Sequence, residues 1–396
     1  MIIMHNNRLY TLLLSFLLYV PGFSQSNEEM PIAAFWGVPD TMSNEKNFKD
    51  FYECGFTVSI YPYWQLETLV KACQIANKSG VKIIGRCPEM FDSPAKTALT
   101  LRKTNGFMGY MIQDEPSVQD MIKRQKEIER INFIDNTHLF YINLLPYYRQ
   151  DWFTKAAKTE TYQEYLKNAS TLQCQQLSFD FYPITTEGIR STWYHNLEMI
   201  RKESLSTNKP FWGFVLSTPH SLYPQPTLAS LRLQVYSNLT YGAQAIQYFT
   251  YWCPTPKNFN YHDAPIDTNG KKTKTYNLVQ KMNKELKEVS KLFYGAKVLS
   301  VHHLGNIPEG TTRQKTMPEN ISKLKITGRP GAIISQLEKD GARYLAIVNK
   351  NHEGTMKVDI KALNGIPRRI SKSLQEERMK ATYIVEAGDL LLFRIK

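Results

Sequence analysis

The alternation of short apolar runs with apolar residues at helical spacing is the feature that most constrains the fold. Eight runs read as buried strands, at 32–38, 56–61, 81–85, 107–112, 139–144, 176–182, 210–216 and 245–251. Each run precedes a segment whose apolar residues recur every three or four positions, which predicts a helix. Strands that alternate with helices pair in parallel through right-handed crossovers. Eight such units over about 260 residues predict a closed (β/α)8 TIM barrel.

An open, doubly wound sheet is the main rival to the barrel. Such sheets usually carry a glycine-rich phosphate loop after the first strand. The corresponding segment here is Gly37-Val38-Pro39-Asp40, which has no such pattern. We therefore expect a barrel over residues 25–295.

The pattern changes after residue 296, where helical spacing disappears. Asp340-Gly341 is a strong hairpin signal between apolar runs at 333–337 and 344–349. Further short strands are expected at 356–360, 369–371, 383–385 and 390–395, and a polar loop at 305–322. Residues 296–396 are therefore predicted to form a small antiparallel β-sandwich domain.

Residues 1–24 have the pattern of a secretory signal peptide. Arg8 precedes an apolar run at 9–20, and Gly22 and Ser24 supply small residues before a cleavage site at Gln25. The run is too short for a stable membrane span. We expect an exported protein, periplasmic or extracellular, without stable membrane insertion.

Charge and cysteine content limit the partners of the chain. The formal net charge is +13, but the lysines are spread over predicted helix faces and the C-terminal third, so no nucleic-acid partner is expected. A solvated basic surface is the simplest interpretation of this charge, and an anionic polysaccharide would also suit such a surface.

The five cysteines show no Cys-x-x-Cys spacing, and we expect them to be small buried residues. No metal and no cofactor are expected.

Acidic side chains gather where the predicted strands end, which is the end of a barrel where active sites are built. The fourth strand ends on Asp114 and Glu115, and the sixth on Asp180. These three residues are the candidate catalytic carboxylates, with Glu115 first. A general acid is what the cleavage of a glycoside requires. Asp180 has a second reading, as a structural acid paired with Arg86.

Amide, aromatic and charged side chains at the strand ends would suit a carbohydrate. Amides bind hydroxyl groups, and aromatic rings stack on sugar faces, although such rings also fill cores. The histidines at 220 and 262 are expected in surface loops. The candidate substrate-binding residues are Trp36, Tyr61, Arg86, Glu89, Asn143, Tyr182, Gln247 and Trp252.

Two segments resemble a known clan. Asp114-Glu115 at the end of the fourth strand, and 267–273 before Tyr276, are similar to segments of the clan of (β/α)8 glycoside hydrolases that includes the family 42 β-galactosidases. The resemblance implies that Glu115 is the general acid/base. It also implies a nucleophilic Glu at the end of strand seven, but the segment 211–219 contains no acid.

Three interpretations remain for the second carboxylate. Asp180 could supply it, as in barrels that use acids on strands four and six, and the roles of the strand-four acids would then change. Glu89 or Asp40 could instead activate water in an inverting enzyme. Alternatively, catalysis could be lost and carbohydrate binding kept.

The sequence therefore predicts an exported glycoside hydrolase that uses carboxylate acid/base chemistry on an oligo- or polysaccharide. The alternative is a catalytically inactive carbohydrate-binding barrel. A metal-dependent hydrolase is disfavoured, because such barrels present several His at strand ends and the predicted strands carry none. The sugar, the linkage and the oligomeric state stay open.

Overall fold

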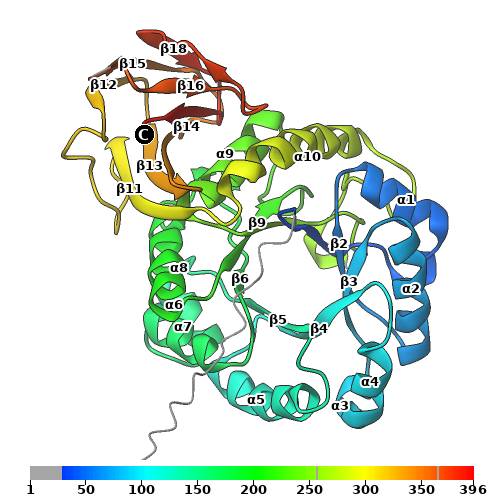
Figure 1. Ribbon diagram of the computed structural model, residues 1–396. Coiled ribbons are helices and arrows are strands. Elements are labelled where there is room, and N and C mark those ends of the chain that lie inside the picture. Colours follow the sequence, from blue (N-terminus) through cyan, green and yellow to red (C-terminus); the bar gives the residue numbers. More distant parts are fainter. Residues whose placement is uncertain (1–28, 256, 364) are drawn as a thin grey trace, which may run out of the picture.

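The computed structural model describes residues 29–255, 257–363 and 365–396, which form a barrel and a sandwich (Figure 1). The predicted signal peptide, residues 1–24, lies outside the described residues. None of the described helices is long and apolar enough to cross a membrane.

Eight parallel strands close into a barrel in the order β1-β10-β9-β6-β5-β4-β3-β2, which confirms the predicted (β/α)8 fold. Strand β1 is shorter than predicted because the chain turns at Trp36, whose φ is 53°. The strands are β1 (Ile32–Phe35), β2 (Val58–Pro62), β3 (Lys82–Arg86), β4 (Phe107–Asp114), β5 (Leu139–Leu144), β6 (Leu177–Phe179), β9 (Phe211–Leu216) and β10 (Ala245–Phe249).

Helices surround the strands in Figure 1. They are α1 (Glu45–Glu53), α2 (Leu66–Lys78), α3 (Glu89–Asp92), α4 (Pro94–Leu101), α5 (Val118–Asn132), α6 (Gln150–Ala157), α7 (Tyr162–Thr171), α8 (Trp193–Thr207), α9 (Leu228–Tyr241) and α10 (Lys274–Phe293), with 3-10 turns η1 (Asp40–Met42) and η2 (Lys257–Phe259). Side-chain caps fix several starts: Ser117 accepts a hydrogen bond from the Asp120 amide at 3.2 Å, and Thr227 accepts one from the Ser230 amide at 3.1 Å.

The barrel strands bury both of their faces, because successive side chains point to opposite sides of a strand. In β5, Tyr141 packs inside the barrel, whereas Phe140 and Ile142 pack against the surrounding helices. The same alternation in β9 places Phe214 inside and Val215 outside. Parallel strands buried on both faces account for the continuous apolar runs in the sequence.

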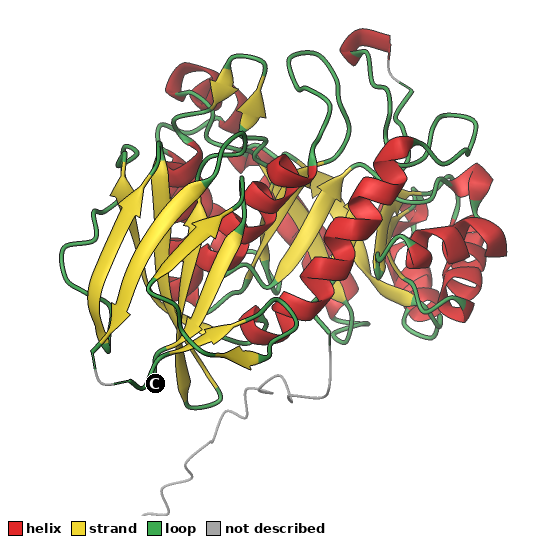
Figure 2. Cartoon of the chain, turned by 90° about the horizontal axis from the view of Figure 1, so that it is seen from above, coloured by secondary structure: helices red, strands yellow, loops and turns green. Residues whose placement is uncertain are grey.

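The C-terminal part is an antiparallel sandwich of a six-stranded and a three-stranded sheet, as predicted. Its strands are β11 (Lys297–Gly305), β12 (Ile321–Thr327), β13 (Gly331–Lys339), β14 (Ala342–Asn349), β15 (Met356–Ala362), β16 (Arg368–Ile370), β17 (Glu376–Glu377), β18 (Thr382–Val385) and β19 (Leu390–Arg394). Figure 2 shows the sandwich beside the barrel. Strands β11, β13 and β14 contact α9, which is why both sides of that helix are buried.

The division into domains 25–295 and 296–396 stays a prediction. Helix α10 ends at Phe293 and β11 begins at Lys297. A small hairpin of β7 (Ile184–Thr185) and β8 (Gly188–Ile189) follows β6, and the sequence did not predict it.

Candidate active site

Strand β4 contains a bulge that decides where its last residues point. The pairing with β5 shifts between Met111 and Gln113, so that Ile112 is an extra residue. A bulge moves every following side chain to the opposite face. Gln113 consequently points outward and accepts a hydrogen bond from Nε of Arg124 on α5 at 2.6 Å. Asp114 points inward, where Nδ2 of Asn143 donates to its Oδ1 at 3.0 Å.

Glu115 follows in a left-handed backbone conformation, with φ of 45°. Such a φ is uncommon for a residue other than Gly and costs free energy. Its amide still donates to the Asn143 carbonyl at 2.8 Å, so the turn begins where the strand pairing ends. Two consecutive carboxylates thereby lie at the same barrel mouth, which strict strand alternation forbids.

Asp114, Glu115 and Asp180 form one electrostatic group. Water reaches Asp114 and Glu115, yet protein surrounds most of each side chain. Burial, and then the charge of Asp114, raise the pKa of Glu115 to about 7. Burial, Glu115 and Asp114, in that order, raise the pKa of Asp180 well above its usual range. Repulsion among the three carboxylates disfavours their simultaneous ionisation and favours a proton on one of them.

A buried polar network supports these acids from inside the barrel. Ser178 donates from Oγ to Oδ1 of Asn143 at 3.0 Å and accepts from Nε2 of Gln247 at 2.8 Å. Tyr141 donates to Oε1 of Gln247 at 2.8 Å. The predicted residues Asn143 and Gln247 therefore act together in orienting Asp114. Sequence reasoning missed Ser178 and Tyr141, although each stands two positions before a candidate residue on its strand, which is the signal that could have found them.

Aromatic side chains enclose the region around Asp180. Burial, and then Tyr223 and Asp180, raise the pKa of Tyr148, whereas burial and then Asp180 raise the pKa of Tyr182. The ring of Tyr182 packs against Tyr223 at 5.8 Å, and the Arg190 guanidinium stacks on Tyr148 at 4.5 Å. Neither Arg190, Tyr148 nor Tyr223 was predicted from the sequence. Oδ1 of Asp180 is buried and has no hydrogen-bond partner among the described residues.

Strand β9 ends without an acid, as the sequence indicated. Oγ of Ser217 donates to the Thr250 carbonyl at 2.8 Å, and the Thr218 hydroxyl is 2.8 Å from that of Thr250. These hydroxyls tie β9 to β10 and do not replace a nucleophilic carboxylate. His220, predicted at the surface, is instead buried: its Nδ1 lies 2.9 Å from the Thr218 carbonyl, and its ring packs against Tyr223 and Tyr261.

The remaining candidate residues occupy several settings. Trp36 and Tyr61 are half-buried and meet edge to face at 5.4 Å near the barrel mouth. Trp252 is buried, and its indole packs against Tyr251. Glu89 accepts a hydrogen bond from the Leu66 amide at 3.1 Å, which anchors the first turn of α2. Their substrate roles stay predictions.

Arg86 forms no ion pair with Asp180. Across residues 29–396, apart from positions 256 and 364, no carboxylate lies within ion-pair distance of its guanidinium. The interpretation of Asp180 as a structural partner of Arg86 is therefore wrong.

The same described residues contain no group of three His, Cys, Asp or Glu side chains that could hold a metal ion. All five cysteines are buried and free, as expected.

Similarity to known proteins is visible in the fold and not in the sequence. No protein-family profile and no curated protein matches the chain. A catalytic mutant of the family 42 β-galactosidase Gan42B from G. stearothermophilus matches with a TM-score of 0.63 and 8% identity, over 94% of this chain and 98% of that one. A β-galactosidase from Bacillus circulans sp. alkalophilus gives 0.59 and 9%, over 92% and 99%. A family 5 glycoside hydrolase from Bacteroides vulgatus gives 0.56 and 12%, over 93% and 89%.

These structures confirm the resemblance at the level of the fold. The chain has the barrel-plus-sandwich architecture of the (β/α)8 glycoside hydrolases. A shared fold does not identify a sugar or an activity, so both are inferred from the residues of the site.

Proposed function

We propose that the protein is an exported glycoside hydrolase in which Glu115 is the general acid/base and Asp180 supplies the second carboxylate. One observation carries the proposal: Glu115 shares the barrel mouth with two further acids, and burial and the charge of Asp114 raise its pKa to about 7. A carboxyl group with that pKa holds a proton at neutral pH and can release it, which is the property of a general acid.

The proposed reaction consumes one water. Glu115 donates its proton to the glycosidic oxygen while the bond from that oxygen to the anomeric carbon breaks. Asp180 either bonds to the anomeric carbon or takes a proton from the water that attacks it. In the first route, water then displaces Asp180 after giving its proton to Glu115. The leaving alcohol gains hydrogen and the anomeric carbon gains hydroxyl in both routes.

The assignment of roles has a rival, because the pKa of Asp180 is also raised, well above its usual range. Asp180 would then be the acid and Glu115 the nucleophile. Substrates with an activated aryl leaving group need no protonation, so they separate the roles. We expect Glu115→Ala to retain cleavage of such a substrate and to gain rate with azide, and Asp180→Ala to lose cleavage of every substrate. The opposite pattern would assign the roles the other way.

A screen of plant and host glycans, followed by NMR of the product anomer, supplies the substrate and the stereochemistry. Glu115→Gln should reduce turnover of that natural substrate by about 100-fold or more, in line with the weight of general acid catalysis. Unchanged turnover in a folded Glu115→Gln protein would contradict the proposal.

The second candidate is an inactive carbohydrate-binding barrel. The observation that favours it is the end of β9, where Ser217 and Thr218 stand without a carboxylate. It predicts glycan binding that Glu115→Gln leaves intact, with no product formed by the unmodified protein in the same screen.

A further inference from the structure

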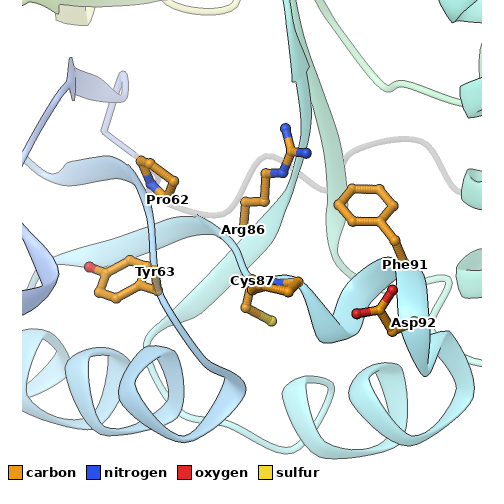
Figure 3. Close-up of a pocket in the computed structure, with 7 residues that line it drawn as sticks. Pro62, Tyr63, Arg86, Cys87, Phe91 and Asp92 are labelled. Atoms are coloured by element: carbon orange, nitrogen blue, oxygen red, sulfur yellow. The ribbon is translucent and has the colours of Figure 1, made fainter.

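A hollow lies at the end of β3, on the same side of the barrel as the three acids. Strand β3 ends at Arg86 and pairs with β4, which ends at Asp114. The hollow has a volume of about 410 Å³, and Pro62, Tyr63 and Phe91 form much of its wall (Figure 3). That volume is within the range of small-molecule sites, roughly 300–1,000 Å³. It has room for a sugar unit on the same side of the barrel as the proposed catalytic group.

Arg86 is the only cation in the lining of this hollow, and it forms no ion pair with a carboxylate of the described residues. Its guanidinium is half-buried and stacks on Phe91 at 4.9 Å. Arg124 stacks on the same ring at 4.9 Å, but it is neutralised by Glu127 at 2.6 Å. In the described part of the chain, no acid pairs with Arg86 in this way. Burial, and then the charge of Arg124, lower the pKa of Arg86, and the charge of Glu127 offsets only part of this effect.

We propose that this hollow binds a carboxylate or sulfate group carried by a sugar of the glycan substrate, with Arg86 as its partner. The inference rests on the proposed function, which it extends to acidic glycans. A guanidinium presents two parallel N–H donors that match the oxygens of either group. The walls of Pro62, Tyr63 and Phe91 offer apolar surface to a sugar ring. A neutral sugar in the same place would bury the cation further without pairing it.

Asp92 also lines the hollow and would repel an anion that lay beside it. It is exposed, and Figure 3 shows the Arg86 guanidinium turned away from the Asp92 carboxylate. Asp92 can therefore accept a hydrogen bond from a sugar hydroxyl while Arg86 holds the anionic group. The net charge of +13 favours the approach of acidic polymers over neutral ones.

The test measures binding by calorimetry in the Glu115→Gln background, so that turnover does not consume the ligand. The probes are oligogalacturonides and glucuronate oligosaccharides, their carboxyl-reduced neutral counterparts, and sulfated chondroitin disaccharides. We expect at least one anionic probe to bind about tenfold or more tightly than its neutral counterpart. Adding Arg86→Gln should weaken that binding roughly 10- to 100-fold and leave the neutral probes within about twofold.

Two further variants make the result specific. Arg86→Lys keeps the positive charge but lacks the two parallel N–H donors of the guanidinium. It should restore part of the affinity that Arg86→Gln loses. Arg149→Gln removes one positive charge from an exposed position beyond the end of β5 and should leave all affinities within about twofold. Binding of carboxylate probes alone, or of sulfate probes alone, identifies the anionic group.

The inference fails if no anionic probe is preferred, or if the preference survives Arg86→Gln in a folded protein. Its failure is distinguishable from that of the proposed function. Hydrolysis of a glycan by the unmodified protein, together with no Arg86-dependent preference for any anionic probe, would retain the hydrolase and remove the anionic subsite. Arg86-dependent anion binding without any product would retain the subsite and remove the hydrolase.

Discussion

Glu115 combines two unfavourable features in one residue. Its backbone has a left-handed φ of 45°, and its carboxyl group has a pKa of about 7 in place of an ordinary value of 4.5. Both features cost free energy of folding, and neither improves packing. Residues that are held at such a cost are frequent at functional sites, where activity and stability conflict.

This conflict predicts a pH-dependent gain in stability for Glu115→Gln. Because the folded protein holds the Glu115 proton more tightly than the unfolded chain does, raising the pH from about 4.5 to 7 destabilises the folded state. The variant does not titrate there. Its free energy of unfolding should exceed that of the unmodified protein by about 1–2 kcal/mol at pH 8, a figure reduced from the full pKa shift because water reaches the side chain.

Urea unfolding at pH 5 and pH 8 measures this effect, and the gain should be much smaller at pH 5. Glu187→Gln, which changes an exposed acid in the β7–β8 turn, is the matched control and should shift stability by less than about 0.5 kcal/mol at both pH values. A Glu115→Gln protein less stable than the unmodified one at pH 8 would show that Glu115 is a structural residue.

At the scale of elements, the junction of β4 and α5 positions the site. Asp114 ends the strand, Glu115 and Pro116 make the turn, and Ser117 caps the helix with a reciprocal bond to Asp120. The Ser117 hydroxyl and the Asp120 carboxylate are 2.7 Å apart, so the start of α5 is well fixed. The cap is therefore also what holds the short turn that carries Glu115.

We expect Ser117→Ala to lower the free energy of unfolding by about 1 kcal/mol and also to lower kcat on the substrate found in the screen. Thr227→Ala removes the cap of α9, which has the same reciprocal arrangement with Ser230. It should cost similar stability and leave kcat unchanged. Equal kcat for both variants would mean that the cap supports the helix but not the position of Glu115.

The sequence predicts the elements better than their irregularities. Eight apolar runs identified the barrel strands, because burial on both faces leaves a strong signal. The bulge at Ile112 has no such signal, so the sequence does not reveal that Asp114 points into the barrel. Strand β12 (Ile321–Thr327) was missed since its exposed lysines interrupt the apolar pattern. The grouping of Asp180 with the strand-four acids followed from barrel geometry, whereas Ser178 and Tyr141 needed the observed contacts.

At the scale of the whole molecule, a cluster of charges joins the barrel to the sandwich. Glu285 of α10 pairs with Arg232 of α9 and with Lys372 of the sandwich, the latter at 3.0 Å. Lys372 also pairs with Asp389 at 2.6 Å, and Arg232 lies 3.5 Å from the same carboxylate. The side chain of Glu285 is only 17% exposed, so these charges interact far more strongly than surface pairs do.

We therefore expect Glu285→Gln to destabilise the protein by about 2–4 kcal/mol at pH 7, since it removes one of the two carboxylates that Arg232 and Lys372 share and leaves Asp389 alone with two cations. Burial alone would raise the pKa of Glu285, but Arg232 and Lys372 outweigh it and lower the pKa to about 2. A lowered pKa contributes stability above pH 4.5 that disappears as the pH falls towards 2. In urea unfolding, the difference between variant and unmodified protein should shrink across that window.

Glu376→Gln is the control. It breaks an ion pair with Arg394 in which both side chains are 48% exposed, and it should lower the free energy of unfolding by less than about 1 kcal/mol. A Glu285 effect as small as this control would mean that apolar packing on α9, and not the charge cluster, holds the sandwich to the barrel.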